Sequence, residues 1–327
     1  MADPILVDET VFEETYIPER LISRKGQIEE IASCLKPAKI GKSIKNLYIY
    51  GPPGVGKTSV TKWILKENFE KISVYVNCWS KRTSHKIMEE ILLQAGYVVH
   101  GKEPTSDLVK RFEKSKKKLI VCLDEIDLLK DAEILYVLAR NSCGLVFISN
   151  QAHALSNVDN RIKSSLFLQE VEFKSYTKDE ILEILKERAN FGLRPDSITN
   201  NLLSIVSGIA GGDARVGLQT LKISAKDAES KDLERIGMQE IKSAVKCARK
   251  YKLSYLLGKL NERQKTIYEI LRKSREMGSG KLLEEYNKTS KENIPERSYR
   301  SYMQRMEELG LVREIGSKRG RKYEIVV

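Results

Sequence analysis

The stretch that most constrains the fold is "GPPGVGKTS", residues 51–59, which fits the spacing G-x-x-x-x-G-K-[S/T]. The apolar run "NLYIY" precedes it, and the helical pattern "TSVTKWILKENF" overlaps its end. Strand, glycine-rich loop and helix in this order are typical of a P-loop, where backbone N–H groups and a helix N-terminus bind phosphate. The sequence therefore predicts a phosphate site within an α/β domain.

We expect six residues of this loop to surround the phosphates of a nucleotide: Gly54, Val55, Gly56, Lys57, Thr58 and Ser59. The Lys57 ammonium would reach the β- and γ-phosphates, and the Thr58 hydroxyl would ligate Mg²⁺. A Gly- and Pro-rich loop that binds nothing is the alternative, and the flanking strand and helix argue against it. The predicted ligands are ATP or ADP and Mg²⁺.

Short apolar runs alternate with helical stretches across the first half of the chain. The runs are residues 46–51, 72–78, 118–125, 144–150 and 165–173. Continuous apolar runs separated by helices predict a parallel sheet covered on both faces. We expect this nucleotide-binding core to occupy residues 1–175. Beyond it the strands disappear, and Thr177 and Glu180 have capping-box spacing at the start of a helical lid domain, residues 176–252.

Polar residues end two of these runs. "KLIVCLDE" ends in Asp124 and Glu125, and "GLVFISN" ends in Asn150. Because parallel strands present their carboxyl ends at one edge of the sheet, these groups should meet the P-loop. We expect Asp124 to hold the Mg²⁺ shell, Glu125 to polarise the attacking water, and Asn150 to orient it. The alternatives are ordinary surface acids and an Asn that only ends a strand. Asp127 is expected to be a cap or an ion-pair partner.

Charge is distributed unevenly along the chain. The 327 residues carry a net charge of +12, and residues 256–327 contribute half of it, with 17 Lys and Arg against 11 acids. This predicts a polyanionic partner, with nucleic acid first and an anionic membrane surface second. With no apolar run of about 18 residues we expect no membrane span. The acidic N-terminus indicates no secretory signal, and the five scattered cysteines indicate free thiols in a reducing cytoplasm.

The basic third region, residues 253–327, contains three helical patterns and then two strands around a basic turn. The patterns are residues 259–277, 280–290 and 294–310, followed by a strand at 311–315, a turn at 316–322 and a strand at 323–327. This is the order of a winged-helix domain, which binds DNA through its third helix. In the turn, Gly316 and Gly320 are expected to bend the chain, so that the basic residues lie at its tip.

The third pattern has two distinct faces. Its apolar face carries Tyr299, Tyr302, Met303, Met306 and Leu309. Its polar face, suited to a major groove, carries Arg297, Arg300, Ser301 and Gln304. Further DNA contacts are expected from the turn, through Lys318, Arg319, Arg321 and Lys322. A solvated helix face is the alternative.

With its P-loop, acid pair, strand-terminal Asn and helical domain, the chain resembles an AAA+ ATPase. It is more closely similar to the archaeal replication-initiator family, relatives of the largest origin-recognition-complex subunit and of the eukaryotic helicase-loading factor. The stretches that carry this resemblance are "VFEETYIPERLISRKGQIEEIASCL" (11–35), "VYVNC" (74–78), "NRIKSSL" (160–166), "FKSYTKDEILEILKER" (173–188), "GIAGGDARVGLQTL" (208–221) and the Arg319-Gly320-Arg321 hairpin. The resemblance runs from about residue 11 to the end.

The resemblance implies roles for two arginines. Arg215, in "GGDAR", matches the second sensor, which contacts the γ-phosphate within the same chain; a helix salt bridge is the alternative. Arg161 matches the arginine finger that reaches a neighbouring subunit's nucleotide. Val158 and Asn160 depart from the Leu and Pro usual beside it.

The resemblance also implies a lining for the nucleotide. Tyr176 and Arg188 match lid residues that line it, and Tyr16, Ile17 and Arg24 are expected around the adenine. Arg188 also shares a helix face with Ile181, Ile184 and Leu185, where an arginine needs a phosphate, a base or a carboxylate as partner. Residues 101–118 are expected to hold either the extra helix with which family members touch DNA or a solvated basic helix.

The function implied by the resemblance is ATP-dependent initiation of DNA replication. Its partners would be double-stranded origin DNA, the MCM replicative helicase and other initiator copies, with the protein in the cytoplasm on the nucleoid. The ATPase would be slow and act as a switch. Two alternatives stay open: a winged-helix transcriptional regulator with a signalling ATPase, and a ring-forming DNA motor such as a Holliday-junction branch-migration ATPase.

Overall fold

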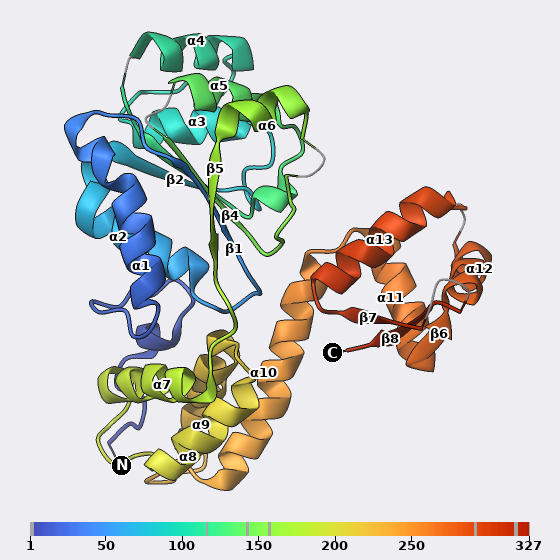
Figure 1. Ribbon diagram of the computed structural model, residues 1–327. Helices are drawn as coiled ribbons and strands as arrows, with labels where there is room; N and C mark the ends of the chain where they lie inside the picture. The colour runs from blue at the N-terminus through green and yellow to red at the C-terminus, as the bar shows by residue number, and fades with distance from the viewer. Residues whose placement is uncertain are drawn as a thin grey trace. The chain divides into compact units, whose positions relative to one another are not determined.

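A computed structural model describes residues 3–115, 117–141, 144–155, 158–290, 293–316 and 320–326. The chain divides into two compact units, Met1–Gly237 and Met238–Val327 (Figure 1). The first unit contains both the expected nucleotide core and three helices of the expected lid. The domain boundaries at residues 175 and 252 stay predictions.

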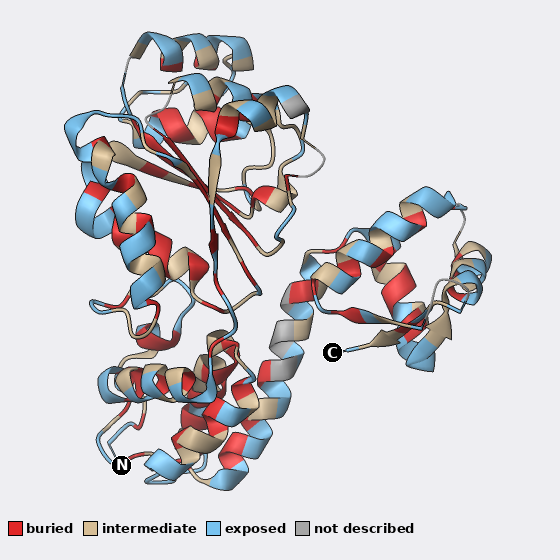
Figure 2. Cartoon of the chain, in the orientation of Figure 1, coloured by how far each residue is buried: buried red, intermediate tan, exposed pale blue. Residues whose placement is uncertain are grey.

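A five-stranded parallel sheet forms the centre of the first unit, as the apolar runs predicted. Its strands are β1 Asn46–Tyr50, β2 Ser73–Asn77, β3 Ile120–Asp124, β4 Gly144–Ser149 and β5 Leu168–Glu172. They are arranged in the order β2-β3-β4-β1-β5. Every residue of β3 and β4 is buried, which explains why their sequences are apolar up to the polar residue that ends each strand (Figure 2).

Helices cover both faces of this sheet (Figure 1). They are α1 Lys25–Leu35, α2 Lys57–Phe69, α3 Ser84–Gln94, α4 Thr105–Ser115, α5 Glu133–Asn141 and α6 Asn160–Leu166, with the 3₁₀ turns η2 Lys36–Ile40, η3 Glu70–Ile72 and η4 Ile126–Leu128. A helix is present in the region expected to hold one, as α4, and its Leu108 and Phe112 are buried in the core cluster that also contains α3 and α5 residues. Its contact with DNA stays a prediction.

Three helices, α7 Lys178–Gly192, α8 Asn200–Ala210 and α9 Ala214–Ser230, follow the last strand. The predicted capping box is present, because the Glu180 N–H donates to the Thr177 hydroxyl over 3.2 Å and the Thr177 N–H donates to the Glu180 carboxylate over 2.8 Å. Asp213 caps α9 through the N–H of Arg215. Capping thus defines where both helices begin.

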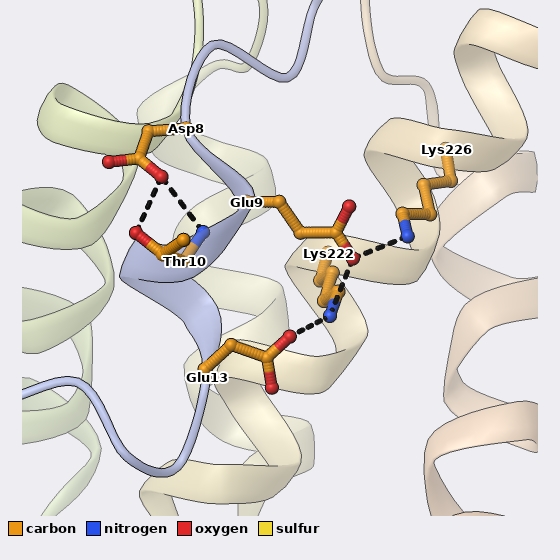
Figure 3. A network of polar contacts seen from close by, with 6 residues as sticks. All are labelled: Asp8, Glu9, Thr10, Glu13, Lys222 and Lys226. Atoms are coloured by element: carbon orange, nitrogen blue, oxygen red, sulfur yellow. Dashed lines mark hydrogen bonds and ion pairs between the residues drawn. The ribbon is translucent and has the colours of Figure 1, made fainter.

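The N-terminal segment packs against this helical layer, which the sequence did not indicate. Its 3₁₀ turn η1, Glu9–Phe12, buries Val11 and Phe12. Figure 3 shows Glu9 between two lysines of α9, with its carboxylate 2.8 Å from Lys222 Nζ and 2.5 Å from Lys226 Nζ. Lys222 also contacts Glu13. The first residues of the chain therefore belong to the same compact unit as the lid.

The second unit consists of α10 Met238–Gly258, α11 Glu262–Ser274, α12 Ser279–Thr289 and α13 Glu296–Glu308, with β6 Glu276–Gly278, β7 Val312–Ile315 and β8 Lys322–Ile325 in the antiparallel order β6-β8-β7. It begins with α10, which lies mostly in the region expected to be the lid, and from α11 onward it has the predicted helix–helix–helix–hairpin order. Strand β6 was not predicted, because its three residues are too few to show an alternating pattern.

Two smaller expectations concern cysteines and the membrane. Cys34, Cys78, Cys122 and Cys247 are free thiols, as predicted; Cys78 and Cys122 are buried, Cys34 is half-buried and Cys247 is exposed, and Cys143 lies outside the described residues. Burial raises the pKa of Cys78 to about 12, so its thiol stays protonated. Among the described residues, no helix has the length and apolar character needed to cross a membrane.

Candidate functional site

The P-loop turns between β1 and α2 through two glycines with left-handed backbones. Gly54 has φ of 77° and Gly56 has φ of 88°. A Cβ at Gly54 would lie 1.8 Å from the Asp213 carboxylate, and one at Gly56 would lie 2.5 Å from the Tyr176 hydroxyl. Larger residues are excluded at both positions by backbone strain and by lack of space. The loop is therefore in direct contact with two residues of the predicted lid, Tyr176 and Asp213.

Lys57 and Asn150, predicted to act on the same phosphate, are in contact. Lys57 Nζ donates to Asn150 Oδ1 over 3.0 Å, and also to the carbonyls of Gly51 (2.7 Å) and Pro52 (2.8 Å). The Lys57 side chain is buried at the first position of α2. A buried ammonium with several acceptors is held in place, as a phosphate-binding lysine must be.

Thr58 and Asp124, the predicted metal ligands, also meet. Thr58 Oγ1 donates to Asp124 Oδ2 over 2.7 Å, and the Glu125 N–H donates to Asp124 Oδ1 over the same distance. Among the described residues, no group of three His, Cys, Asp or Glu side chains could hold a metal ion. One hydroxyl and one carboxylate fit Mg²⁺, because it takes oxygen ligands and commonly shares them with nucleotide phosphates.

Glu125 follows β3 with a left-handed φ of 53°. This conformation is uncommon outside glycine, and such residues cluster at functional sites. Asp127, expected as a cap or ion-pair partner, accepts a hydrogen bond from Ser149 Oγ over 3.1 Å. Ser59 lies half-buried in the first turn of α2.

Tyr75, at this edge of the sheet, belongs to none of the nucleotide motifs in the sequence and was not predicted to take part in the site. The Tyr75 hydroxyl, on β2, donates to Asp124 Oδ2 over 2.6 Å. Burial, and then the Asp124 charge, raise the pKa of Tyr75 well above its usual value, so the hydroxyl remains a donor. The contact depends on β2 pairing with β3, which the sequence of β2 alone does not show.

Arg24 connects the P-loop with the segment before the lid. Its Nε donates to the Val55 carbonyl over 3.2 Å, and a terminal nitrogen donates to the Lys174 carbonyl over 2.6 Å. The guanidinium lies 3.9 Å from the ring centroid of Tyr176 and 5.5 Å from that of Phe173. This buried arginine therefore holds Val55 and Tyr176 together, and its predicted contact with adenine stays untested.

Arg188 is buried on the apolar face of α7, as its spacing predicted. It donates to the Val11 carbonyl over 3.4 Å, and its guanidinium lies 4.4 Å from the ring centroid of Tyr16. Within the described part of the chain, its buried Nε has no hydrogen-bond partner. Burial lowers the pKa of Arg188. The arginine thus has a ring and a carbonyl as partners, and its buried Nε–H is left for a ligand beside half-buried Tyr16.

The two remaining predicted arginines differ in their surroundings. Arg215 pairs with Asp213 at 3.6 Å and with Glu14 at 4.0 Å, so the salt bridge considered as an alternative is present. Its sensor role stays a prediction. Arg161 is exposed in α6, where its N–H donates to Asp159 over 2.7 Å. Exposure suits a side chain that acts on another subunit, and that role also stays a prediction.

The predicted faces of α13 are separated as expected. Tyr299, Met303, Met306 and Leu309 are buried and Tyr302 is half-buried, whereas Arg297, Arg300, Ser301 and Gln304 are all exposed. Arg300 pairs with Glu296 at 3.1 Å, and Gln304 donates to Glu308 over 3.0 Å. In the free protein, two side chains of the polar face, Arg300 and Gln304, are therefore bound to acids of the same helix.

The hairpin differs from its predicted form. Lys322 is the first residue of β8, opposite Ile315 and Gly278, because β6 gives that strand a second partner. It pairs with Glu276 at 2.8 Å, and Arg321 pairs with Glu314 at 2.9 Å. Gly316 has φ of 95°, as a turn glycine should. Lys318 and Arg319 lie outside the described residues.

Family models and relatives match this arrangement. The models are an AAA domain over residues 42–155, a Cdc6 AAA+ ATPase-type lid domain over 182–246 and a Ribonuclease R winged-helix domain over 265–323. ORC1-type DNA replication protein 2 of Methanosarcina mazei is 30% identical over 87% of this chain and 84% of its own length. ORC1-type DNA replication protein 9 of Halobacterium salinarum is 27% identical over 98% and 93%. A solved structure, the Aeropyrum pernix ORC1 protein in complex with DNA, has a TM-score of 0.77 and 25% identity and covers 100% of this chain and 94% of its own.

Proposed function

The chain belongs to the family of ORC1-type DNA replication proteins, and we propose from this premise that it binds replication-origin DNA in an ATP-dependent manner and helps recruit the MCM helicase. Its AAA+ domain implies nucleotide binding and ATPase activity. The observation that carries the proposal is the contact of Asp213 and Tyr176 with Gly54 and Gly56 of the P-loop, in a chain whose winged helix exposes a cationic face.

At the nucleotide, each proposed group has a separate task. Lys57 binds the β- and γ-phosphates, and Asn150, already in contact with it, orients the attacking water that Glu125 polarises. Thr58 and Asp124 hold Mg²⁺, which when bound neutralises charge on the phosphate oxygens. Gly54 to Ser59 supply the backbone cradle.

The proposed ATPase is weak and acts as a switch. Arg215 would exchange its ion pairs with Asp213 and Glu14 for the γ-phosphate, which favours lid closure while ATP is bound. Hydrolysis removes that partner and returns Arg215 to the acids. Arg161 would serve a neighbouring initiator's nucleotide in the same way.

The adenine is proposed to lie near Tyr16, Ile17 and Arg188. The remaining buried N–H of Arg188, beside the Tyr16 ring, supports this location. Arg24 and Tyr176 would close the pocket, because they are stacked on one another next to Val55. Nucleotide would therefore contact the N-terminal segment and the lid together.

The DNA site is proposed on α13 and the hairpin. Arg297, Arg300, Ser301 and Gln304 would enter a major groove, and Lys318, Arg319, Arg321 and Lys322 would contact the backbone or a minor groove. Support comes from the exposure of the α13 face and from the ORC1 structure in complex with DNA. Phosphate contacts would replace the ion pairs with Glu296 and Glu314.

The direct test compares origin duplex with random duplex at physiological salt, in the presence of ATP. We expect tighter binding to origin duplex and co-purification of MCM helicase with the complex. Equal affinity for both duplexes would refute the proposal that the protein recognises replication origins. Binding at promoters without helicase contact would favour the transcriptional regulator, and fast DNA-stimulated hydrolysis by a stable hexamer would favour the motor.

A further inference from the structure

We infer that Tyr75 is a positioning residue that aims the carboxylate of Asp124, the proposed Mg²⁺ ligand; this inference rests on the proposed function. Tyr75 lies on β2, one of the two edge strands of the sheet, and its hydroxyl donates to Asp124 Oδ2 over 2.6 Å. The tyrosine therefore contacts the proposed metal ligand although it belongs to none of the nucleotide motifs.

The register of the sheet explains how a residue of the neighbouring strand reaches this carboxylate. Asn77 is aligned with Asp124, and Tyr75 is aligned with Cys122. Residues two apart on a strand share a face, so Tyr75 and Asp124 project to the same side with an offset of about 6.6 Å along the strand. A tyrosine is long enough to place its hydroxyl across that offset, whereas Ser or Thr is too short.

Two sets of contacts hold Tyr75 in place. Its N–H donates to Gln94 Oε1 over 2.9 Å, and Gln94 Nε2 donates to its carbonyl over 2.8 Å. The ammonium of Lys62, on the helix that begins at the P-loop, lies 4.1 Å from its ring centroid. Because the outer side of an edge strand has no strand partner, Gln94 supplies the missing backbone partners and fixes the tyrosine.

Among the described residues, three donors hold the Asp124 carboxylate: the hydroxyls of Tyr75 and Thr58 and the N–H of Glu125. Thr58 is itself a proposed metal ligand, so Tyr75 is the side chain among them whose only task is to aim the carboxylate. Mg²⁺ demands a near-ideal octahedral geometry, and partners that orient a ligand strongly affect metal affinity. Tyr75 should therefore set the Mg²⁺ dependence of nucleotide binding, and leave metal-free binding unchanged.

The substitution Tyr75→Phe tests this, because it keeps the ring beneath Lys62 and removes only the hydroxyl. Binding of a fluorescent, non-hydrolysable ATP analogue is measured in EDTA and across a Mg²⁺ titration. We expect unchanged affinity in EDTA and an increase of about 10-fold in the Mg²⁺ concentration that gives half-maximal tightening. In hydrolysis assays, saturating Mg²⁺ should restore the kcat.

Lys62→Gln is the matched control, because it removes the contact above the ring and keeps the hydroxyl bond. In Lys62→Gln, the Mg²⁺ concentration that gives half-maximal tightening of nucleotide binding (the Mg²⁺ half-saturation) should equal that of the parent. A Tyr75→Phe protein with a lower Tm but unchanged Mg²⁺ half-saturation would overturn the inference, since the tyrosine would then only support the fold. The same shift in Lys62→Gln would also overturn it.

A second measurement avoids any loss of folding in Tyr75→Phe. With 3-fluorotyrosine at position 75, the ¹⁹F resonance of the nucleotide complex should move when Mg²⁺ is added, and a resonance insensitive to Mg²⁺ would contradict the inference. The same binding measurements distinguish a failure of this inference from a failure of the proposed nucleotide site. A parent protein that binds no ATP analogue in either condition refutes the nucleotide site itself, whereas Mg²⁺-tightened binding that is identical in parent and Tyr75→Phe refutes only the role of Tyr75.

Discussion

The two regions proposed to bind phosphate groups, the P-loop and the polar face of α13, are built in different ways. Lys57 of the P-loop is buried and bonded to Gly51, Pro52 and Asn150. Arg300 of α13 is exposed and pairs with an exposed acid, Glu296. A buried charge must be matched group by group, whereas exposed ion pairs contribute little and are screened by salt. Substitutions should therefore have large, local effects at the first site and small, salt-dependent effects at the second.

The largest expected effect is from Lys57→Ala. It removes the proposed phosphate ligand and the donor shared by Asn150 and two loop carbonyls. We expect ATP binding, followed by fluorescence titration, to be lost, and the free energy of unfolding to fall by about 1–3 kcal/mol. DNA binding should persist, because the winged helix is in the other compact unit.

Lys66→Ala is its matched control, because Lys66 is an exposed residue of the same helix. Retained ATP binding in Lys57→Ala would show that the P-loop is not the nucleotide site. Loss of DNA binding along with ATP binding would instead show that the two regions are not independent.

The next effect in size is from Gly54→Ala. The added Cβ would lie 1.8 Å from the Asp213 carboxylate, at a backbone φ of 77°. We expect destabilisation of about 1–3 kcal/mol in chemical denaturation, together with weaker ATP binding, because the lid can no longer rest on the loop.

Gly26→Ala is a suitable comparison, because Gly26 lies within α1 and a Cβ there meets nothing within 4 Å. That variant should be as stable as the parent or more stable by about 0.5–1 kcal/mol. Equal stability of the two alanine variants would argue that the lid does not rest on Gly54 in solution.

A smaller effect is expected from Arg321→Ala at the DNA site. Each lost phosphate contact should weaken binding to any duplex and lower the slope of log K against log salt by about one. Arg272→Ala is the control, because it breaks a comparable exposed ion pair, with Glu269, on α11. An unchanged salt slope in Arg321→Ala would exclude a phosphate contact by this residue.

The smallest predicted effect concerns the N-terminal segment and pH. Hydrogen bonds from Lys222 and Lys226 lower the pKa of Glu9 to about 2, from an ordinary value of 4.5. Because the folded-state pKa is depressed, the stabilisation is fully present above pH 4.5 and is lost as the pH falls towards 2. Glu9→Gln should therefore lower the Tm slightly at pH 6, with a difference from the parent that narrows below pH 4.5. A difference independent of pH would mean that packing of η1 on α9, and not charge, holds the segment.

The sequence by itself determined the features that rest on local spacing. The P-loop, the strand-terminal Asp124 and Asn150, the capping box at Thr177 and the two-faced α13 were all readable, because each depends on neighbours within a few residues or on one helical period. The order of the last helices and strands predicted a winged helix, and the resemblance of the motifs to an AAA+ ATPase implied an AAA+ core and a lid; the family models confirm all three.

Only the tertiary structure decided which residues distant in sequence meet. It brought Tyr75 to Asp124, Glu9 to Lys222, and Arg215 to Glu14, and it added β6 to the winged-helix sheet. None of these contacts leaves a periodic pattern, because each depends on how strands are registered or how helices pack. Spacing therefore identified the chemical groups of the proposed site, whereas packing decided which partners orient them.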